Sequence, residues 1–323
     1  MTNFSTVAVT GASGLMGRTV VPALHHTGAT VRVLSRHATT HSTTDTIKGD
    51  LADGSGIGAL VTGADAIVHL AGVAHTILRT QSDRDHAHAV NVRGTVQLLQ
   101  AARAAGVRQA IVMSSAHVYA GQQGLNLTEQ SATARDTAYG ALKLEMEEQV
   151  RSMHSPAFRV TILRPCLTYG PAVRHNLHAL LRAIRGGYYI HPGGADAARS
   201  FLSVQTVASA VLHFLQSESA GDTYNLADRE PVSLRAWVNH LADMMDVRKP
   251  RTVPVSILRV VATAGTAASK VGLPAPLTRD SLRKLVAPFS LNTDALASTG
   301  FIWPASHEHV LRSMIEHDRS VNP

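Results

Sequence analysis

The sequence of 323 residues contains one cysteine, few aromatic residues and no long uninterrupted apolar run. The single thiol, Cys166, excludes a disulfide within the chain and is typical of proteins from a reducing compartment. No stretch of about 18 apolar residues is available to span a bilayer, and the first residues lack the basic, apolar and small-residue pattern of a secretory signal. We therefore expect a cytoplasmic protein with no membrane span.

The net charge of +7 indicates an anionic partner, but aromatic residues make up only 4% of the chain and the basic residues form no continuous stripe. This distribution argues against a nucleic-acid partner and favours a small phosphorylated ligand. The 18 histidines include the close pairs His86/His88 and His307/His309. Helical positions two apart point in different directions, so neither pair is suited to chelate one ion. We therefore expect no metal site.

Short apolar runs alternate with helical patterns through the first half of the sequence. Turn residues bound the strands, which we predict at 5–10, 30–34, 46–50, 66–70, 109–114 and 158–163. Apolar periodicity predicts helices at 15–26, 85–105 and 137–153. Strands that alternate with helices form parallel sheets covered on both faces. The pattern therefore predicts an α/β fold with a doubly wound parallel sheet of the Rossmann type.

The alternation breaks after Pro165, where a strand is expected to stop. A helix predicted at 204–216 and a strand at 223–226 return to the sheet, whereas the remainder is mostly helical. We therefore predict two units: a dinucleotide-binding domain over 1–170 with returns near 201–227, and a smaller, mostly helical C-terminal substrate lobe over 171–200 and 228–323.

One segment of this lobe, 255–271, is apolar enough to suggest a membrane helix. It nevertheless contains Arg259 and Lys270 and several Gly, Ser and Thr residues, which disfavour insertion into lipid. We predict a helix pair that lines a pocket or an interface.

A glycine-rich turn lies between the first predicted strand and the first predicted helix. It reads Gly11-Ala12-Ser13-Gly14-Leu15-Met16-Gly17. Glycine at such a turn lets the backbone approach a pyrophosphate, which then binds the N–H groups at the start of the helix. Since a strand precedes the turn and a helix follows it, the motif indicates a dinucleotide site.

The end of the second predicted strand bears on which dinucleotide binds. An acidic side chain there would bind the ribose hydroxyls of NAD, whereas an arginine would accept the phosphate of NADP. No Asp or Glu occurs between Gly17 and Asp45, and Ser35-Arg36 closes the strand. A hydroxyl and a guanidinium suit a phosphate monoester, so the sequence favours NADP over NAD.

Two further patterns supply chemistry. Tyr139 and Lys143 are four residues apart on a predicted helix, so both side chains lie on one face. An ammonium beside a phenol favours its ionised form, which makes the pair a proton donor and acceptor. Ser114-Ser115 ends a strand at the edge where parallel sheets bind ligands, and alternation allows only one of the two hydroxyls to face a pocket there.

Together these patterns resemble the extended short-chain dehydrogenase/reductase superfamily, in particular its NAD-dependent epimerase/dehydratase family. The resemblance covers nearly the whole chain. It rests on Gly11, Gly14 and Gly17; Gly49-Asp50-Leu51; His69-Leu70-Ala71-Gly72; Asn91-Val92-Arg93-Gly94-Thr95; Ser114-Ser115 before Val118-Tyr119; Tyr139 with Lys143; Leu163-Arg164-Pro165 before Tyr169-Gly170-Pro171; and Arg199-Ser200-Phe201.

The resemblance implies roles for individual residues. Ser115, rather than Ser114, would be the catalytic serine, Tyr139 the proton donor and acceptor, and Lys143 the group that lowers its pKa and binds the nicotinamide ribose. The implied cofactor contacts are Gly11, Ser13, Gly14, Leu15, Met16, Gly17, Ser35, Arg36, Asp50, Leu51, Leu70, Ala71, Gly72, Tyr139, Lys143 and Pro165. The implied substrate contacts are Ser115, His117, Asn176 and Arg199, the last two near a nucleotide diphosphate.

The implied activity is hydride transfer to or from a carbonyl or hydroxyl carbon, at C4 of a nucleotide-diphosphate sugar. An NADP preference favours a 4-ketoreductase, because an epimerase recycles its own cofactor. A 4-epimerase, a ketoreductase of a non-sugar small molecule and a non-catalytic NADP-sensing protein are the alternatives. Relatives often form homodimers through a four-helix bundle, which here would use the helices that begin near Asp85 and Thr137.

Overall fold

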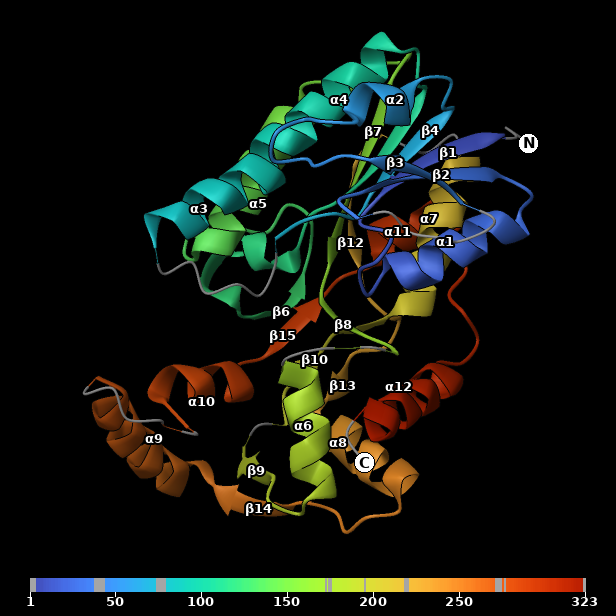
Figure 1. Cartoon of the computed structure of the whole chain (residues 1–323). Coiled ribbons are helices and arrows are strands. Elements are labelled where there is room, and N and C mark those ends of the chain that lie inside the picture. The colour runs from blue at the N-terminus through green and yellow to red at the C-terminus, as the bar shows by residue number, and fades with distance from the viewer. Residues whose placement is uncertain are drawn as a thin grey trace.

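A seven-stranded parallel sheet forms the centre of the molecule (Figure 1). This computed structural model describes residues 4–37, 44–73, 80–171, 173, 176–194, 196–217, 221–270, 275 and 277–321. The strand order is β12-β7-β5-β4-β1-β2-β3. The strands are β1 (Thr6–Thr10), β2 (Thr30–Ser35), β3 (Asp45–Lys48), β4 (Ala66–His69), β5 (Gln109–Met113), β7 (Arg159–Pro165) and β12 (Thr223–Leu226).

Helices cover both faces of this sheet. Helices α1 (Gly17–His26), α7 (Val204–Gln216) and α11 (Asp294–Ser298) pack on one face, and α2 (Ile57–Val61), α4 (Thr95–Ala104) and α5 (Ala138–Arg151) on the other. Side chains of one strand alternate between the layers, so that Val7 and Val9 belong to the first core and Ala8 to the second. Both faces of the sheet are buried, which explains why the strands are apolar without polar alternation. The doubly wound α/β prediction is confirmed.

The order of the strands reverses between β1 and β4, since the chain first adds β2 and β3 on one side and then β4, β5 and β7 on the other. In open parallel sheets the ligand crevice lies outside the carboxyl ends of the strands at this point. The glycine-rich turn after β1 and the residues after β4 both lie there. The topology therefore puts the segments predicted to bind a dinucleotide at the crevice between β1 and β4.

A strand end and a C-terminal helix differ from their predictions. Strand β7 runs to Pro165 rather than ending at 163, and Pro165 pairs with Leu226 at the end of the ladder, where a missing N–H removes little. The segment predicted as a helix pair is one helix, α9 (Val255–Lys270). Within the described ranges, none of the helices combines the length and the hydropathy needed to cross a bilayer.

A smaller lobe follows the sheet and draws strands from distant parts of the chain. Its four-stranded sheet has the order β13-β10-β15-β6, with β6 (Gly124–Leu127), β10 (Ala198–Arg199), β13 (Val232–Ser233) and β15 (Phe289–Leu291). Two ribbons, β8 (Leu167–Tyr169) with β11 (Phe201–Ser203) and β9 (Ile190–Gly193) with β14 (Arg251–Pro254), extend it. Helices α6 (Asn176–Arg185), α8 (Leu234–Met245), α10 (Arg279–Val286) and α12 (Glu308–Val321) complete the lobe with α9. The domain boundaries at 170, 200 and 228 stay a prediction.

A buried ion pair fixes α5 to the central sheet. Glu147 of α5 is fully buried and accepts hydrogen bonds from Arg164 of β7 at 3.0 and 2.7 Å. The Ser114 hydroxyl after β5 donates to the same carboxylate at 2.5 Å. Arg164 also donates to the Tyr119 hydroxyl at 3.2 Å, and Tyr119 in turn donates to Asn225 of β12. Every charge in this network has partners, which is the condition under which burial is tolerated.

We expect Arg164→Leu to lower the free energy of unfolding by about 3–5 kcal/mol, because it leaves the buried Glu147 carboxylate with only the half-exposed Arg151 guanidinium, 3.3 Å away, as a counter-ion. Urea unfolding of the purified chain measures this loss. Arg135→Ala is the matched control, since Arg135 pairs with Glu148 of the same helix and both side chains are half exposed; its loss should stay below about 1 kcal/mol. Equal losses for the two variants would contradict the interpretation.

Candidate active site

The glycine-rich turn brings the start of α1 against the ends of β1 and β4. Gly11 has a φ of +76°, and a Cβ on it would lie 2.6 Å from the Ala71 nitrogen. A Cβ on Gly17 would lie 2.3 Å from the Gly11 carbonyl oxygen. These two positions accept only glycine, because any side chain would displace backbone. The close packing leaves the turn and the helix N-terminus exposed to the crevice, where an anion binds best.

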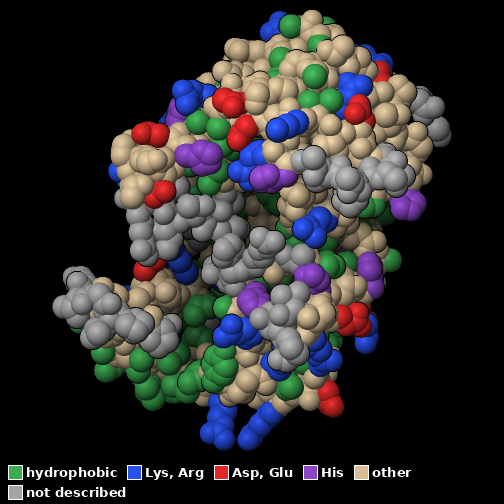
Figure 2. Space-filling view, in the orientation of Figure 1, with side chains coloured by type: hydrophobic (Ala, Val, Ile, Leu, Met, Phe, Trp, Pro, Cys, Tyr) green, Lys and Arg blue, Asp and Glu red, His purple; other side chains and the backbone are tan. Residues whose placement is uncertain are grey.

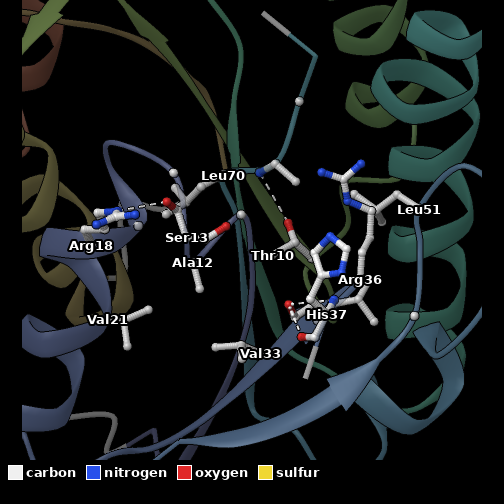
Figure 3. Close-up of a pocket in the computed structure, with 18 of the residues that line it drawn as sticks. Thr10, Ala12, Ser13, Arg18, Val21, Val33, Arg36, His37, Leu51 and Leu70 are labelled. Atoms are coloured by element: carbon white, nitrogen blue, oxygen red, sulfur yellow. Dashed lines mark hydrogen bonds between the residues drawn. The ribbon is translucent and has the colours of Figure 1, made fainter. Parts of the chain in front are cut away.

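A cavity of about 930 Å³ lies along this turn (Figure 3). Of the residues predicted to bind a cofactor, it is lined by Gly11, Ser13, Gly14, Gly17, Ser35, Arg36, Asp50, Leu51, Leu70, Ala71 and Gly72. Its volume suits a ligand larger than a mononucleotide, and it runs from the turn to the end of β2. The segments 11–17, 35–36, 50–51 and 70–72 therefore meet around one cavity.

The cavity is lined by more basic side chains than the sequence alone indicated. Arg18 and His37 lie on it besides Arg36, and Figure 3 shows Arg18 beside Ser13 on one side with Arg36 and His37 on the other. The Arg18 Nε donates to the Ser13 carbonyl at 3.0 Å. Among the described lining residues, Asp50 carries the one carboxylate, and it accepts from the Ala52 backbone. The cavity is suited to a polyanion.

Five of the predicted cofactor residues do not line this cavity: Tyr139 and Lys143, whose surroundings are described below, and Leu15, Met16 and Pro165. Leu15 packs against the core of the lobe, and Met16 packs against the core between the sheet and α1. Pro165 lies at the end of β7, and strands β5, β4 and β1 separate it from β2. Leu15 and Met16 belong to the turn that lines the cavity, but their side chains pack into the cores instead. Pro165 ends a strand at the same edge of the sheet.

Ser114 and Ser115 point to opposite sides, as alternation requires. Ser114 binds Glu147 inside the sheet, whereas the Ser115 hydroxyl hydrogen-bonds the Tyr139 phenol. Gly140 makes this meeting possible, because a Cβ there would lie 2.4 Å from the His117 carbonyl oxygen. The first turn of α5 can therefore press against the short 3₁₀ turn (Ala116–Val118) that follows Ser115.

The environment of Tyr139 keeps its phenol protonated. Burial raises the pKa of Tyr139 to about 12, and the hydrogen bond with Ser115 opposes this rise. The ring of His117 stands edge-on to that of Tyr139, with centroids 5.7 Å apart, and its Nδ1 is 3.1 Å from the Ser115 hydroxyl oxygen. A protonated phenol beside a second hydroxyl can bind a carbonyl oxygen and deliver a proton to it.

Lys143 follows Tyr139 by one helical turn and is buried. Its Nζ donates to the Met113 carbonyl at 2.8 Å and lies next to Gly72, whose added Cβ would be 3.4 Å from it. Burial lowers the pKa of Lys143 to about 8, and the negative charge of Glu147 opposes this fall. The ammonium therefore reaches the wall of the cavity that Gly72 forms.

A buried hydrogen-bond chain that the sequence analysis missed braces the same wall. The Thr95 hydroxyl donates to the Asn91 carbonyl at 3.0 Å, so it accepts from Nε2 of His69 at 2.9 Å. The Thr10 hydroxyl, 2.7 Å away, then donates to Nδ1 and accepts from the Ala71 nitrogen at 3.4 Å. Burial lowers the pKa of His69 to about 3, which keeps the ring neutral for this role.

A π-helical turn lies where one continuous helix is predicted at 85–105. It spans Ala89–Gly94 between α3 (Gln81–His88) and α4. The turn directs the Asn91 side chain to Val73, whose nitrogen donates to Oδ1 at 2.7 Å and whose carbonyl accepts from Nδ2 at 3.0 Å. Such turns are common at functional sites, and this one fixes the backbone that follows β4.

Of the two residues predicted to bind a diphosphate, Arg199 does not line the cavity along the turn. Arg199 lies on β10 and donates to the carbonyls of Lys284 and Ala287 at the C-terminal end of α10, with 2.9 Å to Ala287. Its guanidinium therefore serves as a helix C-cap. Asn176 is the first residue of α6, and its side chain lies outside the described part of the chain.

Comparison with known proteins gives matches over most of the chain. The NAD dependent epimerase/dehydratase family model matches residues 7–227. The "3-diazoavenalumate denitrifying reductase" of a Streptomyces species is 29% identical over 262 residues, 78% of this chain and 85% of that protein. The "4-hydroxy-2-methyl-3-oxo-4-farnesyl-3,4-dihydroquinoline-1-oxide ketoreductase" of Stigmatella aurantiaca is 26% identical over 319 residues, 95% of this chain and 94% of that protein. A crystal structure of an Agrobacterium tumefaciens short-chain dehydrogenase/reductase superfamily protein with bound NAD has a TM-score of 0.73 at 24% identity, covering 98% of each chain.

The buried ammonium predicts a pH-dependent stability. The pKa of Lys143 is about 8 in the folded chain against 10.5 ordinarily, so the unfolded state binds more protons between these values. Stability from this group therefore rises with pH from about 8 to 10.5, by about 3 kcal/mol. We expect the free energy of unfolding of the wild type, measured relative to Lys143→Met, to increase by that order between pH 7 and 10. A constant difference would contradict the burial of a charged lysine.

Proposed function

Because this chain belongs to the NAD-dependent epimerase/dehydratase family of the extended short-chain dehydrogenases/reductases, we propose that it reduces a carbonyl of a small substrate to an alcohol with NADPH. The observation that carries the proposal is the contact between the Ser115 and Tyr139 hydroxyls, with Lys143 one turn along α5. The nicotinamide, when bound, supplies the hydride to the carbonyl carbon. Both relatives named above are reductases, which supports this direction of reaction.

The side chains divide the remaining work. The Ser115 hydroxyl and the Tyr139 phenol bind the carbonyl oxygen and stabilise the charge that develops on it. Tyr139 then gives its proton to that oxygen, a role that its raised pKa suits because the phenol is fully protonated at neutral pH. Lys143 would hold the nicotinamide ribose and would favour the phenolate that remains. His117 orients Ser115 through its ring nitrogen.

The cavity fits the implied cofactor. Gly11 and Gly17 leave room for a pyrophosphate that a single Cβ would fill, and the start of α1 offers its N–H groups. Ser35 and Arg36 lie at the end of β2, with Arg18 also on the cavity. The guanidinium of Arg36 beside the Ser35 hydroxyl favours the 2′-phosphate of NADP over the free hydroxyl of NAD.

For the substrate we propose the 4-keto carbon of a nucleotide-diphosphate sugar, which the family resemblance implies. In this reading Arg199 and Asn176 lie beside the diphosphate, and Arg199 must exchange a helix carbonyl for a phosphate oxygen when the substrate binds. The division into a dinucleotide-binding domain and a substrate lobe belongs to the same proposal.

A second candidate is a ketone without a nucleotide. The bonds of Arg199 to Lys284 and Ala287 favour it, because a guanidinium engaged with carbonyls is not free for a diphosphate. The ketoreductase relative that matches 95% of the chain has a quinoline substrate in its name, which adds support. This candidate uses the same Ser115, Tyr139 and Lys143.

We expect Tyr139→Phe to lower kcat by at least about a hundredfold while leaving cofactor affinity nearly unchanged, because only the phenolic hydroxyl that donates the proton is removed. The assay follows NADPH oxidation with a panel of 4-keto nucleotide sugars and of aromatic and alicyclic ketones. The panel separates the two substrate candidates. An epimerase would instead retain its cofactor through purification and turn over without added NADPH, and full activity of the variant would refute the mechanism.

We expect Arg36→Asp to shift the ratio of the Kd values for NADPH and NADH by about tenfold or more towards NADH, since the aspartate repels the phosphate and binds the ribose hydroxyls. Titration of cofactor fluorescence gives both values. Arg32→Ala is the matched control, because Arg32 lies on the same strand but pairs with Asp45 instead. An unchanged ratio in Arg36→Asp would exclude Arg36 from phosphate binding.

A further inference from the structure

The outer face of α9 is apolar and uncovered. Ile257, Val260 and Val261 are 55%, 72% and 50% exposed, and together they are the largest group of exposed apolar side chains on one element among the described residues. The helix lies at the edge of the lobe farthest from the central sheet, and Figure 2 shows hydrophobic side chains gathered over that edge. Clusters of this kind on a surface mark a contact site.

This stripe is separate from the face by which α9 folds. Leu258 and Ala262 are buried, and with Leu282 of α10 they form a small core. Side chains turn by about 100° per residue along a helix, so 257, 260, 261 and 264 form a second stripe beside the buried one. Packing of the lobe requires only the first stripe. The second stripe has no packing partner among the described residues.

Positive charge surrounds the stripe. From Val247 to Arg279 the sequence has six Lys and Arg residues and no Asp or Glu. Arg248, Arg251 and Arg259 are exposed, and in the described part of the chain none of these three has a carboxylate within ion-pair distance. Figure 2 shows Lys and Arg side chains projecting at the foot of the lobe, beside the hydrophobic group.

We propose that α9 docks the protein on the surface of a membrane that contains anionic phospholipids. A helix with an exposed apolar stripe and flanking cations lies in the plane of the lipid headgroups, with the stripe in the acyl boundary and the cations on phosphates. A second copy related by two-fold symmetry would bring the same cations together, which disfavours self-association.

The test is cosedimentation of the full chain with vesicles of phosphatidylcholine alone and with about one third phosphatidylglycerol. We expect binding to the anionic vesicles, and about a tenfold weaker apparent affinity for the variant with Ile257→Ser, Val260→Ser and Val261→Ser. Ile302→Ser is the matched control, because Ile302 is 84% exposed on a different segment and its loss should change nothing. Thermal melting verifies that each variant is folded.

A fluorophore gives an independent measurement. Cys166 is buried, so a polarity-sensitive dye attaches selectively to Val260→Cys, and its emission should shift to the blue when anionic vesicles are added. A dye on Ile302→Cys should not respond. Absence of wild-type binding to anionic vesicles, or equal binding of the triple variant, would overturn the proposal. So would a dimer that the triple variant dissociates without any vesicle binding, since the occupant would then be a second copy.

Discussion

The position of the proposed catalytic groups depends on the pair between Glu147 and Arg164. Tyr139, Lys143 and Glu147 recur at four-residue intervals on α5, so fixing the last of them to β7 fixes the other two over the ends of the strands. Burial makes the pair strong and also makes it costly to break, because a lone charge in that layer has no water. The same carboxylate anchors Ser114, which leaves Ser115 to face the phenol.

This arrangement keeps the Glu147 carboxylate apart from the hydrogen-bond donors that face the crevice. Around the proposed catalytic groups, the negative charge of Glu147 lies in the interior behind the strands, where it holds α5 and partly offsets the desolvation of Lys143. The side towards the crevice offers donors: two hydroxyls, an ammonium and the start of α1. A surface of preorganised donors without a facing carboxylate is the environment in which an oxyanion is most stabilised. The neutral His69 adds rigidity there without adding charge.

The sequence supports prediction where the signal is local. The turn at Gly11 to Gly17, the spacing of Tyr139 and Lys143, and the alternation of strands and helices each lie within a short stretch whose periodicity dictates geometry. The prediction of a parallel sheet followed from the alternation of strands and helices. The partners of Arg199 did not, because they come from α10, more than 80 residues later in the chain.

Three other features were not predicted from the sequence, for related reasons. The chain of bonds through His69 depends on which ring nitrogen meets which hydroxyl, and no pattern in the sequence encodes that choice. The π-turn at Asn91 differs from an α-helix by a single shifted bond, which periodicity over 85–105 does not resolve. The exposure of α9 was also missed, because composition alone does not tell whether an apolar helix has one neighbour or two.

The four-stranded sheet of the lobe has a consequence for biosynthesis. Its central strand β15 is flanked by β6 and β10, so residues near 124, 199 and 290 must meet before the sheet exists. Such long sequence separations slow the closing of a structure. During translation the parallel sheet up to β7 can form while the edge of β6 stays unpaired, and that edge becomes protected only when the segment around residue 290 has left the ribosome.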